Sequence, residues 1–227
     1  MKYFYLYIFV LLGFIFIVSY YNTYINSYKE SFNSEKQNFI LLGDSILKND
    51  RYVSNGQSLQ FLLMERTNNK THCYAVDDSK IIDVYKQIDL IPYEFNTSYT
   101  TIFLSIGGND ILQNCLENKA NCNKTDLVPM FSAYKNLIKS IQTKFPNANI
   151  VVLDIYYPNN LKYKQYHELI DEWNNMIYDY ARESSKNNIT SVLKISNILT
   201  HPDDFTLDIE PSAIGTKKMV DIILSSY

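Results

Sequence analysis

Two apolar runs in the sequence end abruptly in small and polar residues. Residues 39–42 lead into a Gly-Asp-Ser triplet that ends at Ser45, and residues 102–106 lead into a Gly-Gly-Asn-Asp stretch that contains Asn109. Short apolar runs that stop at glycine are typical of strands buried on both faces of a parallel sheet. The polar groups then emerge at the carboxyl ends of the strands, where open α/β sheets bind ligands and carry out chemistry. We therefore expect Ser45 and Asn109 to face one crevice.

These two motifs resemble the first and third sequence blocks of the GDSL hydrolases, also called SGNH hydrolases, a family of esterases and lipases. The resemblance implies that Ser45 is the nucleophile. It also implies an oxyanion hole formed by the main-chain N–H of Ser45, a main-chain N–H from the second block and the side chain of Asn109. A Gly-Asp-Ser triplet by itself is typical of turns. Both blocks together, in the family's order, are a much more specific signal.

The last block departs from the family pattern. The family usually ends in Asp-x-x-His-Pro, in which the histidine is the general base and the aspartate orients it. In this chain Glu210 stands at the histidine position and Leu207 at the aspartate position, so the usual Ser-His-Asp triad is not present at these positions. The Glu-Pro-Ser sequence, followed by Gly215, resembles a divergent branch of the same superfamily. We therefore interpret Glu210 as a feature of that branch.

Glu210 is the leading candidate for the general base, and His201 is the alternative. A carboxylate at its ordinary pKa of about 4.3 is a weak base toward a serine hydroxyl, so the role requires burial that raises the pKa toward neutrality. His201 precedes Pro202 in a loop and would have to swing into the crevice; its other interpretation is a solvated loop histidine. We assign no catalytic role to His72 or His167.

Asp78 stands where the second block of the family has a glycine. Its main-chain N–H remains a donor, because only proline lacks one, so Asp78 is the expected second oxyanion donor. A carboxylate beside a developing oxyanion opposes that charge unless the side chain points away. The orientation of Asp78 therefore bears directly on turnover.

The elements that must position these residues alternate between strand and helix. Such alternation predicts a flavodoxin-like three-layer α/β/α sandwich with a five-stranded parallel sheet and right-handed crossovers. Helical spacing is clearest around Trp173, which we interpret as a core residue. The expected strands are 38–43, 72–76, 101–106, 149–155 and 189–194, and the expected helices are 55–68, 79–90, 126–144, 161–186 and 212–225.

Composition excludes several classes of function. The 227 residues suit one domain, and a net charge of −3 with mixed signs provides no basic stripe for nucleic acid. The spacing of cysteine and histidine does not resemble a zinc site, and we expect neither a metal nor another cofactor.

The first segment of the chain predicts a membrane anchor. Residues 3–21 carry no charge and are apolar or aromatic except for Ser19, and about 20 apolar residues span a bilayer. A cleaved signal peptide is the alternative, although no small-x-small cleavage site follows. We expect a single-pass anchor over residues 1–21, a polar stalk over 22–37 and a hydrolase-like domain over 38–227.

The expected location of that domain is lumenal or extracellular. Four Asn-x-Ser/Thr sequons fit such a compartment, in which Cys115 and Cys122 could also pair. The charges that flank the apolar segment set the orientation only weakly.

Two hypotheses of function follow from these observations. The first is a membrane-anchored hydrolase of carboxylic esters that works through an acyl-Ser45 intermediate. The second is a catalytically inactive relative that binds an acyl or glycan ligand, or a protein partner, in the same crevice. The substrate of the first hypothesis stays open among a lipid, an acylated sugar and a thioester.

Overall fold

The computed structural model describes residue 13 and residues 15–20, 37–68, 70–117, 123–183 and 189–226. The chain divides into two units, Met1–Gln37 and Asn38–Tyr227. In the first unit the described residues 13 and 15–20 are helical. No helix within the described residues has both the length and the apolar character needed to cross a bilayer. The predicted anchor and stalk lie largely outside the described residues.

The second unit is built on a five-stranded parallel sheet with the strand order β2-β1-β3-β4-β5. This order is the flavodoxin-like one, which confirms the predicted fold class. The chain leaves β1 toward β2 on one side and continues from β3 toward β4 on the other, so the order reverses between β1 and β3. The strands are β1 (Asn38–Gly43), β2 (Thr71–Cys73), β3 (Thr100–Ser105), β4 (Asn149–Leu153) and β5 (Ile189–Leu193).

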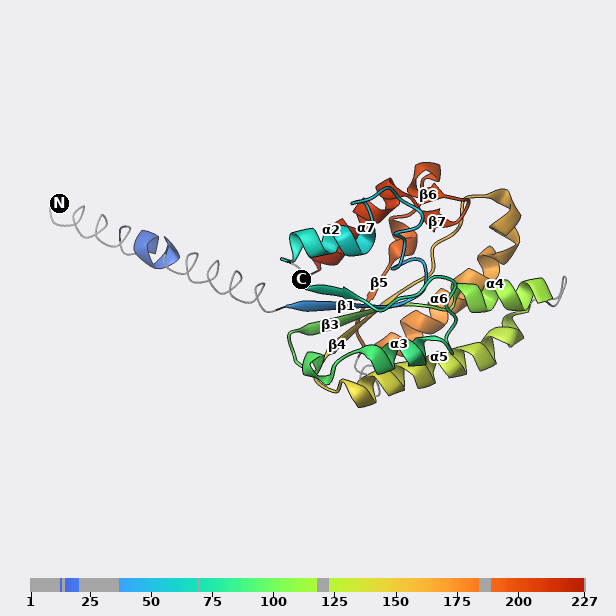
Figure 1. Cartoon of the computed structure of the whole chain (residues 1–227), viewed down its shortest axis with the longest axis horizontal. Helices are drawn as coiled ribbons and strands as arrows, with labels where there is room; N and C mark the ends of the chain where they lie inside the picture. The colour runs from blue at the N-terminus through green and yellow to red at the C-terminus, as the bar shows by residue number, and fades with distance from the viewer. Residues whose placement is uncertain are drawn as a thin grey trace, which may run out of the picture. The chain divides into compact units, whose positions relative to one another are not determined.

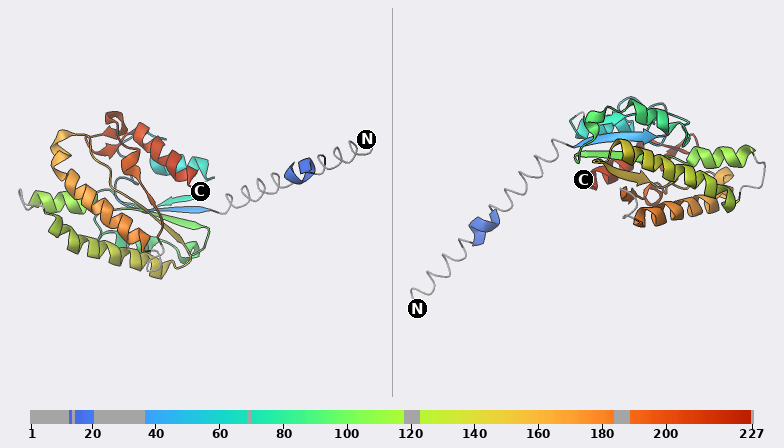
Figure 2. Two further views of the ribbon diagram at one scale, coloured as in Figure 1. Left: turned by 180° about the vertical axis from the view of Figure 1, so that it is seen from behind. Right: turned by 90° about the horizontal axis from the view of Figure 1, so that it is seen from below.

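Helices cover both faces of the sheet, as Figures 1 and 2 show. Residues of α2 (Leu59–Arg66) and α7 (Ala213–Ser225) pack on one face, and residues of α3 (Val84–Leu90), α5 (Lys124–Lys144) and α6 (His167–Arg182) pack on the other. The remaining α-helix of this unit among the described residues, α4 (Gly108–Glu117), follows the carboxyl end of β3.

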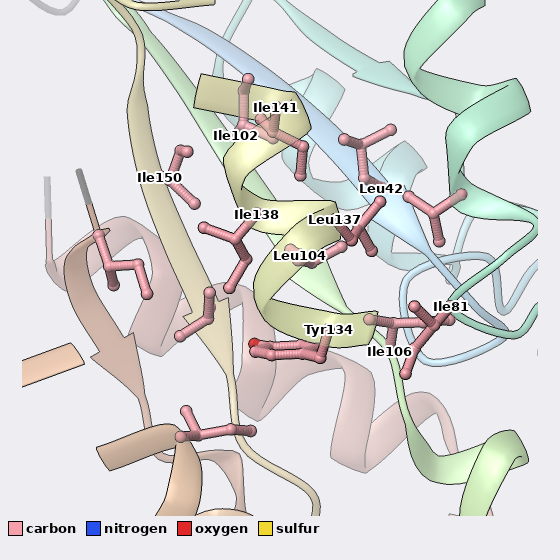
Figure 3. Close-up of a cluster of buried hydrophobic side chains, with 14 of the residues drawn as sticks. Leu42, Ile81, Ile102, Leu104, Ile106, Tyr134, Leu137, Ile138, Ile141 and Ile150 are labelled. Atoms are coloured by element: carbon pink, nitrogen blue, oxygen red, sulfur yellow. The ribbon is translucent and has the colours of Figure 1, made fainter. Parts of the chain in front are cut away.

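The two faces of the sheet form separate apolar cores because side chains alternate along each strand. In β1, Ile40 and Leu42 point toward α3, α5 and α6, whereas Phe39 and Leu41 point toward α2 and α7. Figure 3 shows the first core, in which Leu137 and Ile141 of α5 lie over the strands. Trp173 is fully buried in this core, as predicted.

Several predicted boundaries are wrong. The helix expected over residues 79–90 begins only at Val84, because residues 79–83 form turns that bring the second block to the site. Residues 161–166 form a 3₁₀ helix, η2 (Leu161–Tyr166), instead of the first turns of α6. Helix α4 was not expected, because the Gly-Gly-Asn-Asp stretch at its start is typical of a turn.

Candidate active site

A cavity opens at the carboxyl ends of β1, β3 and β4. It is lined by Ser45 after β1, by Asn109 in the first turn of α4 and by Glu210 near the carboxyl end of the chain. The structure therefore brings together the predicted nucleophile, oxyanion donor and base. The rest of the wall is mostly apolar and aromatic, and it includes Ile46, Ile106, Ile111, Leu112, Ile155, Tyr163, Tyr166, Ile170, Ile195 and Ile209.

Ser45 is placed by a close approach between the ends of β1 and β3. Gly43 has a φ of +126°, and a Cβ atom at this position would lie 1.7 Å from the main-chain oxygen of Ser105. Only glycine fits such a contact. The N–H of Asp44 donates to the same Ser105 oxygen at 3.1 Å. The chain then turns away from the sheet and presents Ser45 to the cavity.

The Ser45 hydroxyl donates a hydrogen bond to Oε1 of Glu210 at 3.2 Å. The pKa of Glu210 is raised to about 7. Burial is the largest cause and the negative charges of Asp77 and Asp78 add to it, whereas the Ser45 hydrogen bond lowers the pKa. A carboxylate with a pKa near neutrality is a suitable proton acceptor at physiological pH. The burial required for a glutamate base is therefore present.

A short hairpin holds Glu210 in place. Strands β6 (Phe205–Thr206) and β7 (Glu210–Pro211) pair antiparallel. At the hairpin tip, the Asp208 carboxylate accepts hydrogen bonds from Lys162 at 2.6 Å and from Asn160 at 2.8 Å. The Tyr156 hydroxyl donates to the main-chain oxygen of Ile209. These contacts hold Asp208 and Ile209, the two residues directly before Glu210.

The Asn109 side chain is oriented by the second block. Its Nδ2 donates to the main-chain oxygen of Ser79 at 3.0 Å. A side-chain amide carries two N–H donors, so one remains for a ligand. Gly107, with a φ of +112°, lies against the buried Trp173 ring and allows the chain to enter α4 at this angle.

Asp78 adopts a left-handed conformation with a φ of +58°, the region that glycine favours. Its side chain is exposed, and it is absent from the cavity lining within the described part of the chain. The carboxylate therefore does not line the cavity, although its negative charge still raises the pKa of Glu210. The role of the Asp78 N–H stays a prediction.

His201 lies outside the cavity. Its side chain is 66% exposed, and its Nδ1 accepts the N–H of Asp203 at 3.3 Å. It thereby caps the short 3₁₀ helix η4 (Pro202–Asp204). The structure does not bring His201 to Ser45, and Leu207, at the position of the usual orienting aspartate, is exposed at the hairpin tip.

Two carboxylates in the cavity wall were not predicted as site residues. Asp44 is buried beside Ser45, and desolvation raises its pKa to about 8 although Ile46 N–H and the Ser105 hydroxyl donate to it. Asp154 is buried as well but accepts hydrogen bonds from Ser196 and Tyr178. The sequence signal that could have identified both residues is an aspartate directly after a buried strand.

The predicted pairing of Cys115 with Cys122 lies outside the residues whose side chains are described. The sequons at positions 69 and 188 also start outside the described residues.

Several solved structures share this fold. A member of the lipolytic protein G-D-S-L family from Veillonella parvula superposes with a TM-score of 0.62 at 20% identity, covering 84% of this chain and 98% of that one. An extracellular lipase from Streptomyces rimosus gives 0.64 at 14% identity, covering 84% and 100%. A family 3 carbohydrate esterase from Clostridium thermocellum gives 0.60 at 22% identity, covering 83% and 94%.

No protein-family model and no curated protein matches the sequence. The structural superpositions confirm the fold that the resemblance of the two motifs predicted.

Proposed function

We propose that the chain is a divergent GDSL-type serine hydrolase that cleaves carboxylic esters through an acyl-Ser45 intermediate. One observation carries the proposal: the Ser45 hydroxyl is hydrogen-bonded at 3.2 Å to a glutamate whose pKa is about 7, in a cavity that also presents Asn109. A nucleophile, a base and an oxyanion donor are the groups that acyl transfer requires. The names of the superposed lipase and carbohydrate esterase agree with this reaction.

In the acylation step, Ser45 Oγ attacks the ester carbonyl carbon while its proton passes to Oε1 of Glu210. The carbonyl oxygen becomes an oxyanion, which the Asn109 amide and the N–H groups of Ser45 and Asp78 stabilise. No protein acceptor takes the Ser45 N–H within the described residues, so this donor is available. The intermediate then expels the alcohol, which receives the proton from Glu210 and leaves Ser45 acylated.

Deacylation repeats these chemical steps with water as the nucleophile. Glu210 takes a proton from the attacking water, and the same donors hold the second oxyanion. Collapse of this intermediate breaks the bond between Ser45 Oγ and the acyl carbon. The serine recovers its proton from Glu210, and the carboxylic acid leaves.

The wall of the cavity favours an apolar acyl group. The residues beside Ser45 and Asn109 are mostly isoleucine, leucine and tyrosine. Each buried CH₂ group contributes about 0.8 kcal/mol to binding such a surface. We therefore expect esters with an alkyl chain to be hydrolysed faster than the corresponding acetate. A butanoate, octanoate and acetate series of p-nitrophenyl esters measures this preference.

The alternative function is binding without turnover, of an acyl or glycan ligand or of a protein partner. It is favoured by the missing orienting group: Leu207 is exposed, and Oε2 of Glu210 is buried without a hydrogen-bond partner among the described residues.

Labelling with a fluorophosphonate probe separates the two functions. The full chain should react at Ser45, and Ser45→Ala should abolish the labelling and the ester hydrolysis together. If wild-type protein does not react with the probe from pH 6 to 9 and hydrolyses no ester, the hydrolase function is contradicted and the binding function is supported.

We further propose that the enzyme is a single-pass membrane protein whose hydrolase domain faces the lumen or the exterior. The support comes from the sequence: residues 3–21 carry no charge and have tyrosines at both ends, which suits the two interfaces of a bilayer.

A further inference from the structure

We propose that Gln87 is a positioning residue that sets the distance between the nucleophile and the oxyanion donors. The inference rests on the hydrolase function proposed above. Gln87 lies in α3, outside the cavity lining, and its side chain is 2% exposed. It therefore acts on the reaction through other residues and not by touching the substrate.

The amide of Gln87 binds both polar groups of one main-chain unit. Its Oε1 accepts the N–H of Gly43 at 2.8 Å, and its Nε2 donates to the Gly43 carbonyl oxygen at 2.8 Å. Gly43 precedes Ser45 by two positions. Any displacement of this main-chain unit is thus transmitted directly to the nucleophile.

The shortness of β2 explains why β1 needs this side chain. Strand β2 pairs only with residues 39–41 of β1. Beyond that point the edge of β1 is completed by Val76 N–H, which donates to the Gly43 oxygen at 3.0 Å, and by Gln87. A buried N–H without an acceptor costs about 1–3 kcal/mol, so the Gly43 N–H depends on the Gln87 amide.

The same amide also reaches the second block. Gln87 Nε2 donates to the Ser79 hydroxyl at 3.1 Å, and the Ser79 main-chain oxygen accepts from Asn109 Nδ2 at 3.0 Å. Ser79 is 4% exposed. Hydrogen bonds therefore connect Gly43 to Gln87, Gln87 to the Ser79 side chain, and the Ser79 main chain to Asn109. This set of contacts links all three blocks that are proposed to build the nucleophile and the oxyanion hole.

The structure offers a matched control for this arrangement. Asn174 is also 2% exposed, and its amide likewise binds both polar groups of one residue, Ile155, at 2.8 and 2.7 Å. Within the described residues, no hydrogen bond connects Asn174 to Ser45 or Asn109. Replacing either Gln87 or Asn174 should cause the loss of stability that follows from removing a buried amide. Only replacement of Gln87 should also affect the oxyanion hole.

The test is a double-mutant cycle on ester hydrolysis by the full chain. Gln87→Met keeps the shape and removes the three hydrogen bonds; kcat should fall about 10²-fold with little change in KM, because misplacement by about 1 Å costs that much. In the Asn109→Ala background the same substitution should cost clearly less, because one of the donors whose distance from the nucleophile it sets is absent. Asn174→Leu should have the same effect in both backgrounds.

Ser79→Ala covers the case in which Gln87→Met does not fold. It removes one hydrogen bond and keeps the carbonyl that holds Asn109, so a smaller loss of kcat that vanishes in the Asn109→Ala background is expected. The role of Gln87 is overturned if both single variants keep full kcat, or if each substitution causes the same loss in the wild-type and Asn109→Ala backgrounds. Either result leaves the proposed hydrolase function intact, because the wild-type chain is active. A wild-type chain that neither hydrolyses esters nor reacts with a fluorophosphonate overturns the hydrolase function itself.

Discussion

The Ser45 hydroxyl donates to one oxygen of Glu210, whereas the other oxygen is buried without a hydrogen-bond partner in the described part of the chain. A serine triad normally has a third group that orients the base. Here the orientation comes from the hairpin, whose tip is bound by Lys162 and Asn160 and whose backbone is bound by Tyr156. Ser45 and Glu210 thus form a hydrogen-bonded pair, and side-chain contacts to the hairpin hold Glu210 in place.

Glu210→Gln tests the base. The amide keeps the shape of the side chain and cannot accept the proton, so kcat should fall by about 10²-fold to 10⁴-fold. Circular dichroism checks that the fold is kept. His201→Ala should change kcat by less than about twofold, because His201 is exposed outside the cavity. Loss of activity in His201→Ala, with activity kept in Glu210→Gln, would assign the base to the histidine.

The rate should rise with pH through the ionisation of Glu210. Only the carboxylate form accepts a proton, so kcat/KM should rise with a midpoint near pH 7 and level off above it. Asp78→Asn removes a negative charge that raises this pKa, so the midpoint of the profile should move to lower pH. The shift should shrink in high salt, because Asp78 is exposed. A profile that is flat between pH 5 and 9 would contradict the assignment.

Folding stability should fall as the pH rises toward 8. Burial raises the pKa of Asp44 from 3.8 to about 8 and that of Glu210 from 4.5 to about 7, so between these values the folded state holds protons that the unfolded chain has lost. The free energy of unfolding must then decrease with pH across this window. Asp44→Asn should flatten the slope measured by urea unfolding at pH 5 and pH 8. Asp50→Asn, which removes an exposed carboxylate, is the control.

Gly107→Ala should destabilise the fold, whereas Gly108→Ala should not. A Cβ at Gly107 would lie 2.4 Å from the Trp173 ring, and its φ of +112° disfavours a side chain. Such strain costs about 1–3 kcal/mol in the free energy of unfolding. A Cβ at Gly108 meets no atom within 4 Å, in a helix where alanine is favoured over glycine. Equal unfolding midpoints for the two variants would be inconsistent with the close contact at Gly107.

The N-terminal segment should hold the chain in the membrane. Full-length protein should stay in the pellet after a carbonate wash, and deletion of residues 1–36 should release a folded domain, because the apolar segment precedes Asn38. Recovery of the full-length chain in the soluble fraction without N-terminal cleavage would exclude the anchor.

Local patterns in the sequence determine the sheet and half of the site. The apolar runs before Ser45 and Asn109 predict buried parallel strands, and such strands end at one edge, so the two residues were expected in one crevice. Local patterns failed at α4 and at residues 79–83. The Gly, Asn and Asp residues at the start of α4 suit both a turn and a helix start, and Ser79 and Asp83 likewise suit a turn or a helix cap; tertiary contacts decide between the two.

The sequence offered Glu210 and His201 as candidate bases, and only the tertiary structure shows which of the two lies beside Ser45. Glu210 is separated from Ser45 by 165 positions, and its contact depends on a hairpin tip held by Lys162. The pKa of about 7 comes from burial and from neighbouring charges, which no sequence window contains. The sequence likewise left open whether the loop of His201 reaches Ser45. In the structure, His201 Nδ1 accepts the N–H of Asp203, and the side chain is exposed outside the cavity.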